Sequence, residues 1–145
     1  MEAAWAKLPE PYPLILEVMA MAGMRLGEAL AMSWANLDVR NLQYNVTETT
    51  RQERFGPPKS GKRLIDLDAP LGAKLEAHIK RLRKESLATG VHAYYPFPGI
   101  APRMVQGAMR RACQAARLRI RSPHDLRHTY STILLMVHIS PAYVQ

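Results

Sequence analysis

The chain has 145 residues, of which 48% are hydrophobic, so it is long and apolar enough for one ordinary folded domain, and a disordered chain is excluded. Lysine and arginine number 20 against 12 acidic residues, and the net charge of +8 points to an anionic partner, nucleic acid first and a membrane surface second. Residues 1–13 lack the order of a signal peptide, and the apolar run over 14–24 is too short to span a bilayer. We therefore expect a soluble protein.

The first half of the chain predicts two helices followed by two strands. Apolar spacing places a mostly buried helix over 13–22 and a second helix over 25–34. Alternating, strand-forming residues over 44–50 and 63–68 predict two strands. The segment 51–62 between them holds four cations and two prolines, so we expect a basic hairpin.

The second half predicts three helices and a loop. A basic amphipathic helix is expected over 70–90, a loop with a buried aromatic anchor over 91–102, and a further helix over 103–118. The single cysteine, Cys113, excludes an internal disulfide and is expected as a buried thiol in a reducing, cytoplasmic setting. Another helix is expected to begin at Ser122, and one more at Ser140. The fold class is therefore α+β and mainly helical, with a small antiparallel sheet or hairpin.

The stretch from Ser122 to Thr129 concentrates polar chemistry at a helix start. Ser122 can cap the helix, Pro123 suits its first position, and Asp125 favours the positive end of the helix dipole. His124 and Arg127 stand at i and i+3, so they share one face next to free backbone N–H groups. Such a place suits a phosphate, although a capped helix with a solvated polar face explains the same residues.

One phosphate motif in the hairpin is rejected. Residues 56–62 satisfy the G-x-x-x-x-G-K spacing of a nucleotide-binding P-loop. However, Arg63 stands where a Ser or Thr should bind Mg²⁺, and Pro57 and Pro58 remove amide donors from the phosphate cradle. The segment that follows predicts a strand instead of a helix. We therefore expect no nucleotide here.

Four segments in this order resemble the catalytic domain of the tyrosine recombinases, the phage integrase family. They are Gly23-Met24-Arg25-Leu26-Gly27-Glu28, Pro58-Lys59-Ser60-Gly61-Lys62-Arg63, His124-Asp125-Leu126-Arg127-His128-Thr129 and Ser140-Pro141-Ala142-Tyr143-Val144-Gln145. The resemblance covers the chain from about Pro13 to its end. It implies a helical catalytic domain of the DNA breaking-rejoining type, which acts in site-specific recombination or integration in bacteria or their phages.

The resemblance implies that a tyrosine attacks a DNA backbone phosphate and forms a phosphotyrosine link, without a metal, a nucleotide or another cofactor. It assigns Arg25 and Arg127 to the scissile phosphate, Lys59 to the hairpin lysine and His124 to the same cluster. Guanidinium forks suit non-bridging phosphate oxygens, and an ammonium can protonate the leaving oxygen. Imidazole, which changes charge near neutral pH, suits orientation or proton transfer.

Other residues receive supporting roles by the same resemblance. Glu28 is expected to hold Arg25 or to cap its helix, and Lys62 competes with Lys59 for the lysine role. DNA contacts are expected from four residues, which are Lys62, Arg63, Arg121 and His128. The expected partners are duplex DNA and, in the full-length protein, further copies of itself on DNA. Neither a membrane nor a nucleotide is expected.

Two departures from the family pattern limit what residues 1–145 are expected to do alone. The nucleophilic tyrosine and the family's second histidine-or-tryptophan position are expected beyond Gln145, and the N-terminal DNA-clamping domain is expected to be absent. Tyr130 and Tyr143 are expected as packing residues, and His138 as a turn residue. Residues 1–145 are therefore expected to form a single catalytic-domain fragment that is inactive by itself.

Two alternatives are weighed against this interpretation. A non-catalytic DNA-binding relic or regulator of the same fold would share its charge and its affinity for phosphate. A metal hydrolase could use His124 and His128 at i and i+4, but the glutamate of the zinc motif is missing beside the first histidine and a cation, Arg127, lies between them. We therefore expect no metal.

Overall fold

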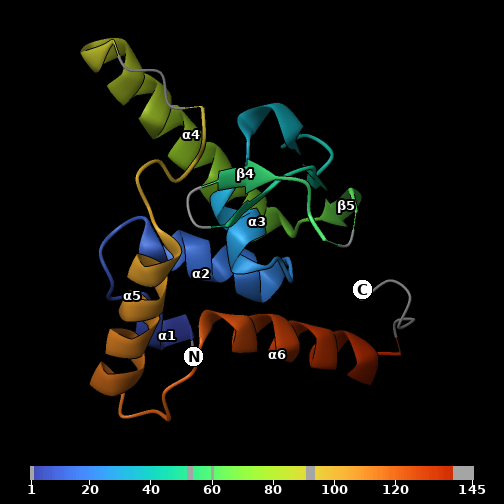
Figure 1. Cartoon of the computed structure of the whole chain (residues 1–145), viewed down its shortest axis with the longest axis vertical. Helices are drawn as coiled ribbons and strands as arrows, with labels where there is room; N and C mark the ends of the chain where they lie inside the picture. Colours follow the sequence, from blue (N-terminus) through green and yellow to red (C-terminus); the bar gives the residue numbers. More distant parts are fainter. Residues whose placement is uncertain (1, 52–53, 60, 91–93, 139–145) are drawn as a thin grey trace. The chain divides into compact units, whose positions relative to one another are not determined.

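The computed structural model describes residues 2–51, 54–59, 61–90 and 94–138 (Figure 1). The contacts group these residues into two compact units. The first unit comprises the described residues of 1–26 and 102–145, and the second comprises those of 27–101. Among the described residues, no helix combines the length and apolar character needed to cross a bilayer. The single catalytic domain expected over 1–145 stays a prediction.

The first unit is helical and is built around one buried helix. It contains α1 (Glu2–Trp5), α2 (Tyr12–Met21), α5 (Pro102–Ala115) and α6 (Pro123–Met136). Helix α2 contacts the other three helices, and its side chains are buried around most of its circumference, including Leu14, Ile15, Leu16, Val18 and Met19. A helix that is enclosed by neighbours is apolar on more than one face, as the sequence predicted.

Helix α5 confirms the predicted buried cysteine but ends earlier than predicted. Its buried side chains recur at helical spacing, and Cys113 is one of them. The helix was expected to reach residue 118 and ends at Ala115, because Arg117 adopts a left-handed conformation with φ +54°. The Leu118 amide then donates to the Cys113 carbonyl at 2.9 Å and closes the helix end.

The second unit contains two small antiparallel sheets (Figure 1). The three-stranded sheet has the order β1 (Leu37–Asp38), β2 (Gln43–Val46) and β5 (Arg63–Asp66). The two-stranded sheet pairs β3 (Thr49–Arg51) with β4 (Arg54–Gly56). The predicted strand over 44–50 was therefore wrong in its continuity, because its two halves pair with different partners. Strands β1 and β4 lie in segments that were not predicted as strands.

The predicted helix over 25–34 was too long. Helix α3 (Leu26–Leu30) stops early, and a 3₁₀ turn η1 (Trp34–Asn36) follows it. The Ser33 hydroxyl accepts a hydrogen bond from the Ala35 amide at 3.3 Å and begins that new turn. The Ser33 amide donates to the Tyr44 hydroxyl at 3.3 Å, so a contact with β2 replaces a helical hydrogen bond.

Helix α4 (Ala69–Thr89) agrees with its prediction at both ends. The Asp68 carboxylate accepts from the Leu71 amide at 2.7 Å, and Gly90 at φ +72° closes the helix in a left-handed conformation. The apolar face of α4 is buried, whereas its basic face is exposed. The structure therefore confirms the amphipathic helix that the sequence predicts.

The loop after α4 is anchored by a buried aromatic ring, as predicted. Phe97 is buried and lies 5.6 Å from the ring of His78 on α4. The His78 Nδ1 atom lies 2.8 Å from Arg81 Nη2, and its Nε2 atom lies 2.7 Å from the Pro96 carbonyl oxygen. Because a guanidinium only donates, Nδ1 accepts and Nε2–H donates to the loop. The helix expected at Ser140 lies outside the described residues.

Tyr44 makes the stability of the second unit sensitive to alkaline pH. Burial raises the pKa of this phenol from 10.0 to about 12, since the phenolate would lose its hydration. The neutral form therefore stabilises the fold below pH 10, and this stabilisation is lost as the pH rises through 12. We expect wild type to lose about 2–3 kcal/mol from this group across that interval. Tyr44→Phe should lose less over the same interval in urea unfolding, and parallel pH curves would contradict this.

Candidate functional site

Helix α6 begins as predicted, and its first turn exposes His124 while it buries Pro123 and Leu126. The Ser122 amide donates to the Asp125 carboxylate at 2.7 Å, which is one half of a capping box. This hydrogen bond lowers the pKa of Asp125 below its usual 3.8. The cap is therefore fully formed above that pH and is lost as the pH falls through the lowered pKa. The helix start carrying His124 and Arg127 is thus fixed at neutral pH.

The two histidines of this helix touch each other. His124 and His128 are both exposed, and their rings meet edge to face with centroids 4.6 Å apart. His124 occupies the second helical position, where backbone N–H groups have no intrahelical acceptor. An anion at this turn would therefore meet imidazole and amide donors together.

Arg127 ties helix α6 to the turn that carries Arg25. Its Nη1 atom donates to the Gly23 carbonyl oxygen, and Gly23 lies two residues before Arg25. Arg25 and Arg127 are each half-buried. The first unit therefore contains three of the four predicted catalytic residues, Arg25, His124 and Arg127. Within this unit, the hydrogen bond to Gly23 joins Arg127 to the loop that carries Arg25.

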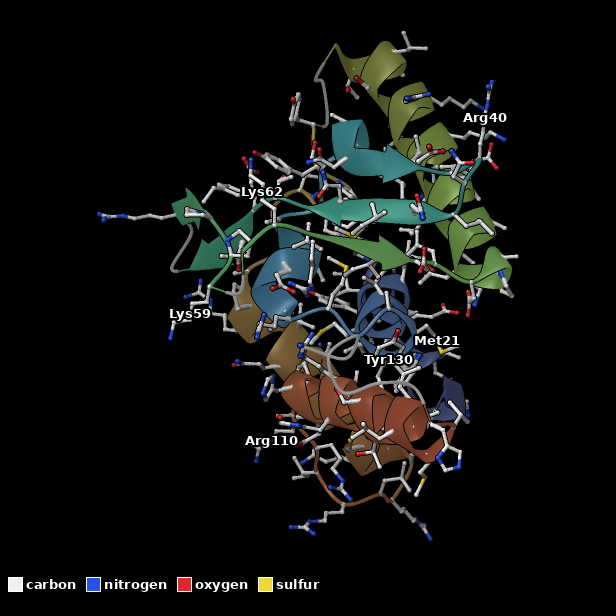
Figure 2. The ribbon with its side chains drawn as sticks, turned by 90° about the vertical axis from the view of Figure 1, so that its right-hand side faces the viewer. Met21, Arg40, Lys59, Lys62, Arg110 and Tyr130 are labelled. Atoms are coloured by element: carbon white, nitrogen blue, oxygen red, sulfur yellow. The ribbon has the colours of Figure 1, made fainter. Side chains whose placement is uncertain are left out.

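Gly23 is required at this contact by both its conformation and its surroundings. It has φ +60°, and a Cβ atom added there would overlap the ring of Tyr130 on α6. Figure 2 shows Tyr130 on the side of α6 that faces α2. Tyr130 is therefore a packing residue, as predicted, and its ring fixes the approach of the Gly23 turn. Tyr143 lies outside the described residues.

We expect Gly23→Ala to destabilise the protein by about 2–4 kcal/mol, through positive-φ strain and overlap with Tyr130. Gly99→Ala is the matched control, because Gly99 has φ +72° and open space around it. The control should lose only the conformational part, about 1 kcal/mol. Chemical denaturation of both variants measures the difference. Equal losses would show that Tyr130 does not fill the space above Gly23.

The second unit carries the two candidate lysines on the chain between β4 and β5. Lys59 and Lys62 are both exposed, whereas Pro58 is buried. The Gly61 amide donates to the Pro58 carbonyl at 3.1 Å and closes a turn around Lys59. Figure 2 shows both lysines at the end of the sheets away from Arg40. The choice between Lys59 and Lys62 as the catalytic lysine stays open.

Glu28 and Arg63 form an ion pair that was not predicted. Arg63 Nη1 and Nη2 donate to the two carboxylate oxygens of Glu28 at 3.0 and 2.6 Å. The Glu28 side chain is 1% exposed and that of Arg63 is 20% exposed. Glu28 was expected to serve Arg25 or the helix end, and Arg63 to contact DNA. The ion pair between them was not predicted, because 35 positions separate the two residues and no local sequence pattern indicates their contact.

Gly27 brings α3 close to β3. A Cβ atom at this position would lie 2.6 Å from the Thr49 hydroxyl oxygen and 2.6 Å from the Thr50 carbonyl oxygen. Only a residue without a side chain fits against that backbone. Two consecutive residues, Gly27 and Glu28, therefore seat α3 against strands of the second unit.

The remaining predicted DNA contacts lie on the surface. Arg121 is exposed in the segment before α6, and His128 is exposed one turn after His124. His138 has φ +61° and lies in a turn after α6, as predicted. The DNA contacts of Arg121 and His128 stay predictions.

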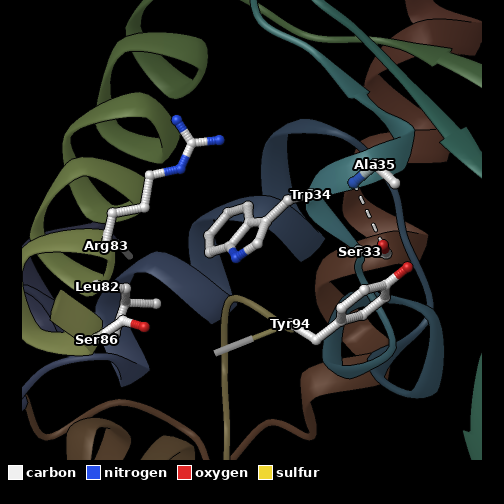
Figure 3. Close-up of a pocket in the computed structure, with 7 residues that line it drawn as sticks. All are labelled: Ser33, Trp34, Ala35, Leu82, Arg83, Ser86 and Tyr94. Carbon is white, nitrogen blue, oxygen red and sulfur yellow. Dashed lines mark hydrogen bonds between the residues drawn. The ribbon is translucent and has the colours of Figure 1, made fainter. Parts of the chain in front are cut away.

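A cavity of about 360 Å³ in the second unit is separate from these residues. Figure 3 shows its lining from η1, α4 and the following loop, which comprises Ser33, Trp34, Ala35, Leu82, Arg83, Ser86 and Tyr94. None of the predicted site residues lines this cavity. Its walls combine two aromatic rings, Trp34 and Tyr94, with aliphatic, serine and arginine side chains.

Comparisons with known proteins identify the family. The model of the phage integrase family matches residues 1–145. The prophage integrase IntR of Escherichia coli K12 is 27% identical over 148 residues, which cover 85% of this chain and 36% of that protein. The chain thus spans about a third of the length of this curated relative.

Solved structures share the fold. The Tn1549 transposon integrase in complex with a circular intermediate DNA has a TM-score of 0.81 at 17% identity, over 99% of this chain and 54% of that one. The XerA recombinase has a TM-score of 0.76 at 18% identity, over 99% and 50% of the two chains. These matches confirm the predicted mixed fold, mainly helical with small antiparallel sheets. The chain belongs to the phage integrase family, the tyrosine recombinases.

Proposed function

We propose that this chain supplies the phosphate-activating part of a site-specific DNA recombinase or integrase. The observation that carries the proposal is the hydrogen bond from Arg127 to the Gly23 carbonyl. This bond holds Arg127 at the turn that carries Arg25. Structures of relatives support DNA as the partner. One is described as the Tn1549 integrase in complex with transposon right end DNA, and another as XerH bound to its difH substrate.

The arginines and His124 act on the scissile phosphate in this proposal. Guanidinium donors on the non-bridging oxygens offset the charge that accumulates as phosphorus becomes five-coordinate. A tyrosine oxygen forms the new bond to phosphorus while the bond to the leaving DNA oxygen breaks. Lys59 gives its proton to that leaving oxygen. No tyrosine of residues 1–145 is assigned as the nucleophile, and no cofactor takes part.

Duplex DNA is the proposed binding partner, with Lys62, Arg121 and His128 as further contacts outside the phosphate cluster. The excess of cations over acidic residues supports this proposal. Binding that rests on phosphate contacts releases counterions, so it weakens steeply as salt rises.

Fluorescence anisotropy with a labelled duplex tests the proposal. We expect the logarithm of the association constant to fall linearly with the logarithm of salt concentration between about 50 and about 200 mM. Replacing Lys59 and Lys62 together by alanine should reduce the slope by about 2. Arg40→Ala removes an exposed charge at the other end of the sheet and should leave the wild-type slope less changed. Equal affinity at the two salt concentrations would contradict the proposal.

A further inference from the structure

We propose that Arg63 is a positioning residue for the Lys59 turn and does not bind DNA. It would act through Glu28, which joins the start of β5 to helix α3. This inference rests on the proposed role of Lys59. It replaces the expectation that Arg63 contacts a phosphate.

The geometry of the ion pair fixes orientation as well as distance. Two parallel N–H···O bonds, at 3.0 and 2.6 Å, align the planar guanidinium with the planar carboxylate. The Glu28 side chain is almost fully buried, so water cannot replace Arg63 without a large loss. A lysine at position 63 could supply the charge but not the fork.

The place of Arg63 in the sheet connects this pair to Lys59. Arg63 is the first residue of β5 and pairs with Val46, the last residue of β2. Lys59 precedes Arg63 by four positions and lies in the turn closed by the Gly61 amide. Helix α3 also lies close to β3 at Gly27, and β3 pairs with β4, the strand before this turn. Helix α3 therefore contacts β5, which follows the turn, and the partner strand of β4, which precedes it.

The charge of the pair argues against a DNA contact by Arg63. One guanidinium and one carboxylate in a bidentate pair have no net charge, so together they add little attraction for a polyanion. The two terminal nitrogens of Arg63, which would form a fork on a phosphate, already donate to Glu28. The fork uses one N–H of each terminal nitrogen, so a phosphate would have to compete for the remaining N–H groups of a side chain that is only 20% exposed.

A double-mutant cycle on DNA affinity tests the proposal in the 145-residue chain. The variants are Arg63→Lys, Lys59→Ala and the double variant, with Arg40→Lys as the control for an exposed arginine. Arg63→Lys keeps the charge, so long-range attraction to phosphate would survive it, while the bidentate fork to Glu28 would not. We expect Arg63→Lys to weaken binding about tenfold, a typical loss for one charge-assisted hydrogen bond. In the Lys59→Ala background, Arg63→Lys should weaken binding no further.

Glu28→Gln provides a second variant from the buried side of the pair. It raises the net charge of the chain by one, so electrostatic attraction alone predicts tighter DNA binding. A positioning role predicts weaker binding, again only when Lys59 is present. Amide hydrogen exchange gives an independent readout: Gly61 should exchange faster in Arg63→Lys, relative to the Ile65 amide in the same sheet.

The outcomes separate this inference from the function on which it rests. Additive losses in the cycle, or tighter binding by Glu28→Gln, would overturn the positioning role and leave the proposed function intact. If Lys59→Ala binds DNA like wild type, Lys59 makes no contribution to DNA affinity and the cycle has no signal to divide. In that case Gly61 exchange decides the positioning role, since faster exchange supports it and unchanged exchange overturns it.

Discussion

Arg63→Met is expected to lower the free energy of unfolding by about 3–5 kcal/mol, the largest loss expected from a single charged residue of this chain. The substitution leaves the Glu28 carboxylate buried at 1% exposure without its bidentate donor. A buried carboxylate that loses a bidentate counter-ion keeps the cost of its desolvation and loses the attraction that offset it. Urea unfolding at neutral pH measures the loss.

The double variant Glu28→Leu with Arg63→Met is the control for this prediction. Replacing a buried ion pair by apolar residues of similar volume is often neutral, so the double variant should recover most of the lost stability. Arg40→Met, at an exposed position of the same unit, should change stability by about 0.5 kcal/mol or less. If Arg63→Met behaves like Arg40→Met, the pair does not hold the fold together.

Arg127→Ala is expected to weaken binding to duplex DNA by about tenfold or more, because a charge-assisted contact to phosphate is lost. The same change removes a donor from the Gly23 carbonyl and should cost about 1–3 kcal/mol of stability. Arg127→Lys restores the charge but cannot bond Gly23 and a phosphate in the same geometry, so its DNA affinity should recover only in part. Anisotropy titrations and urea unfolding separate the two effects.

Arg110→Ala is the matched control for Arg127. Arg110 is exposed on α5 in the same unit, so its removal changes the net charge equally. Its loss of affinity should be small and should disappear at high salt. Equal losses for Arg110→Ala and Arg127→Ala would mean that Arg127 contributes only its charge.

Helix boundaries could be predicted where the stop and start signals are local. Asp68, Gly90 and Ser122 each act within a few residues along the chain, and the structure places helix ends at all three. The end of α3 could not be predicted in this way. Leu26, Leu30 and Trp34 keep helical spacing, but the hydrogen bond from Ser33 to Tyr44 joins residues 11 positions apart and favours a new turn.

Strand pairing was predicted only in part for the same reason. The ladder of β2 with β5 follows from two alternating segments and a basic loop. The division of residues 44–50 between two sheets depends on β4, which is three residues long and has no pattern of its own. Contacts between strands decide which strand β4 pairs with, and such contacts cannot be read from a single sequence.

The residue types of the candidate site could be identified from motifs, but their partners could not. The motifs identify Arg25, His124 and Arg127 from the sequence alone. The contact between Arg127 and Gly23 spans 104 positions, and that between Glu28 and Arg63 spans 35. Only the folded chain brings such residues together, so the pairing of Glu28 with Arg63 could not be predicted.

Binding to a nicked duplex in the presence of orthovanadate tests most directly whether Arg25, His124 and Arg127 hold a phosphate in its reacting geometry. Vanadate forms esters with the hydroxyls at a nick and takes the five-coordinate geometry of phosphoryl transfer, which a catalytic site binds more tightly than its substrate. We expect vanadate to strengthen binding by about tenfold in wild type and in Arg40→Ala, and not in Arg25→Ala or Arg127→Lys. Equal affinity with and without vanadate in wild type would contradict a phosphate-activating site and would instead fit a DNA-binding relic of the same fold.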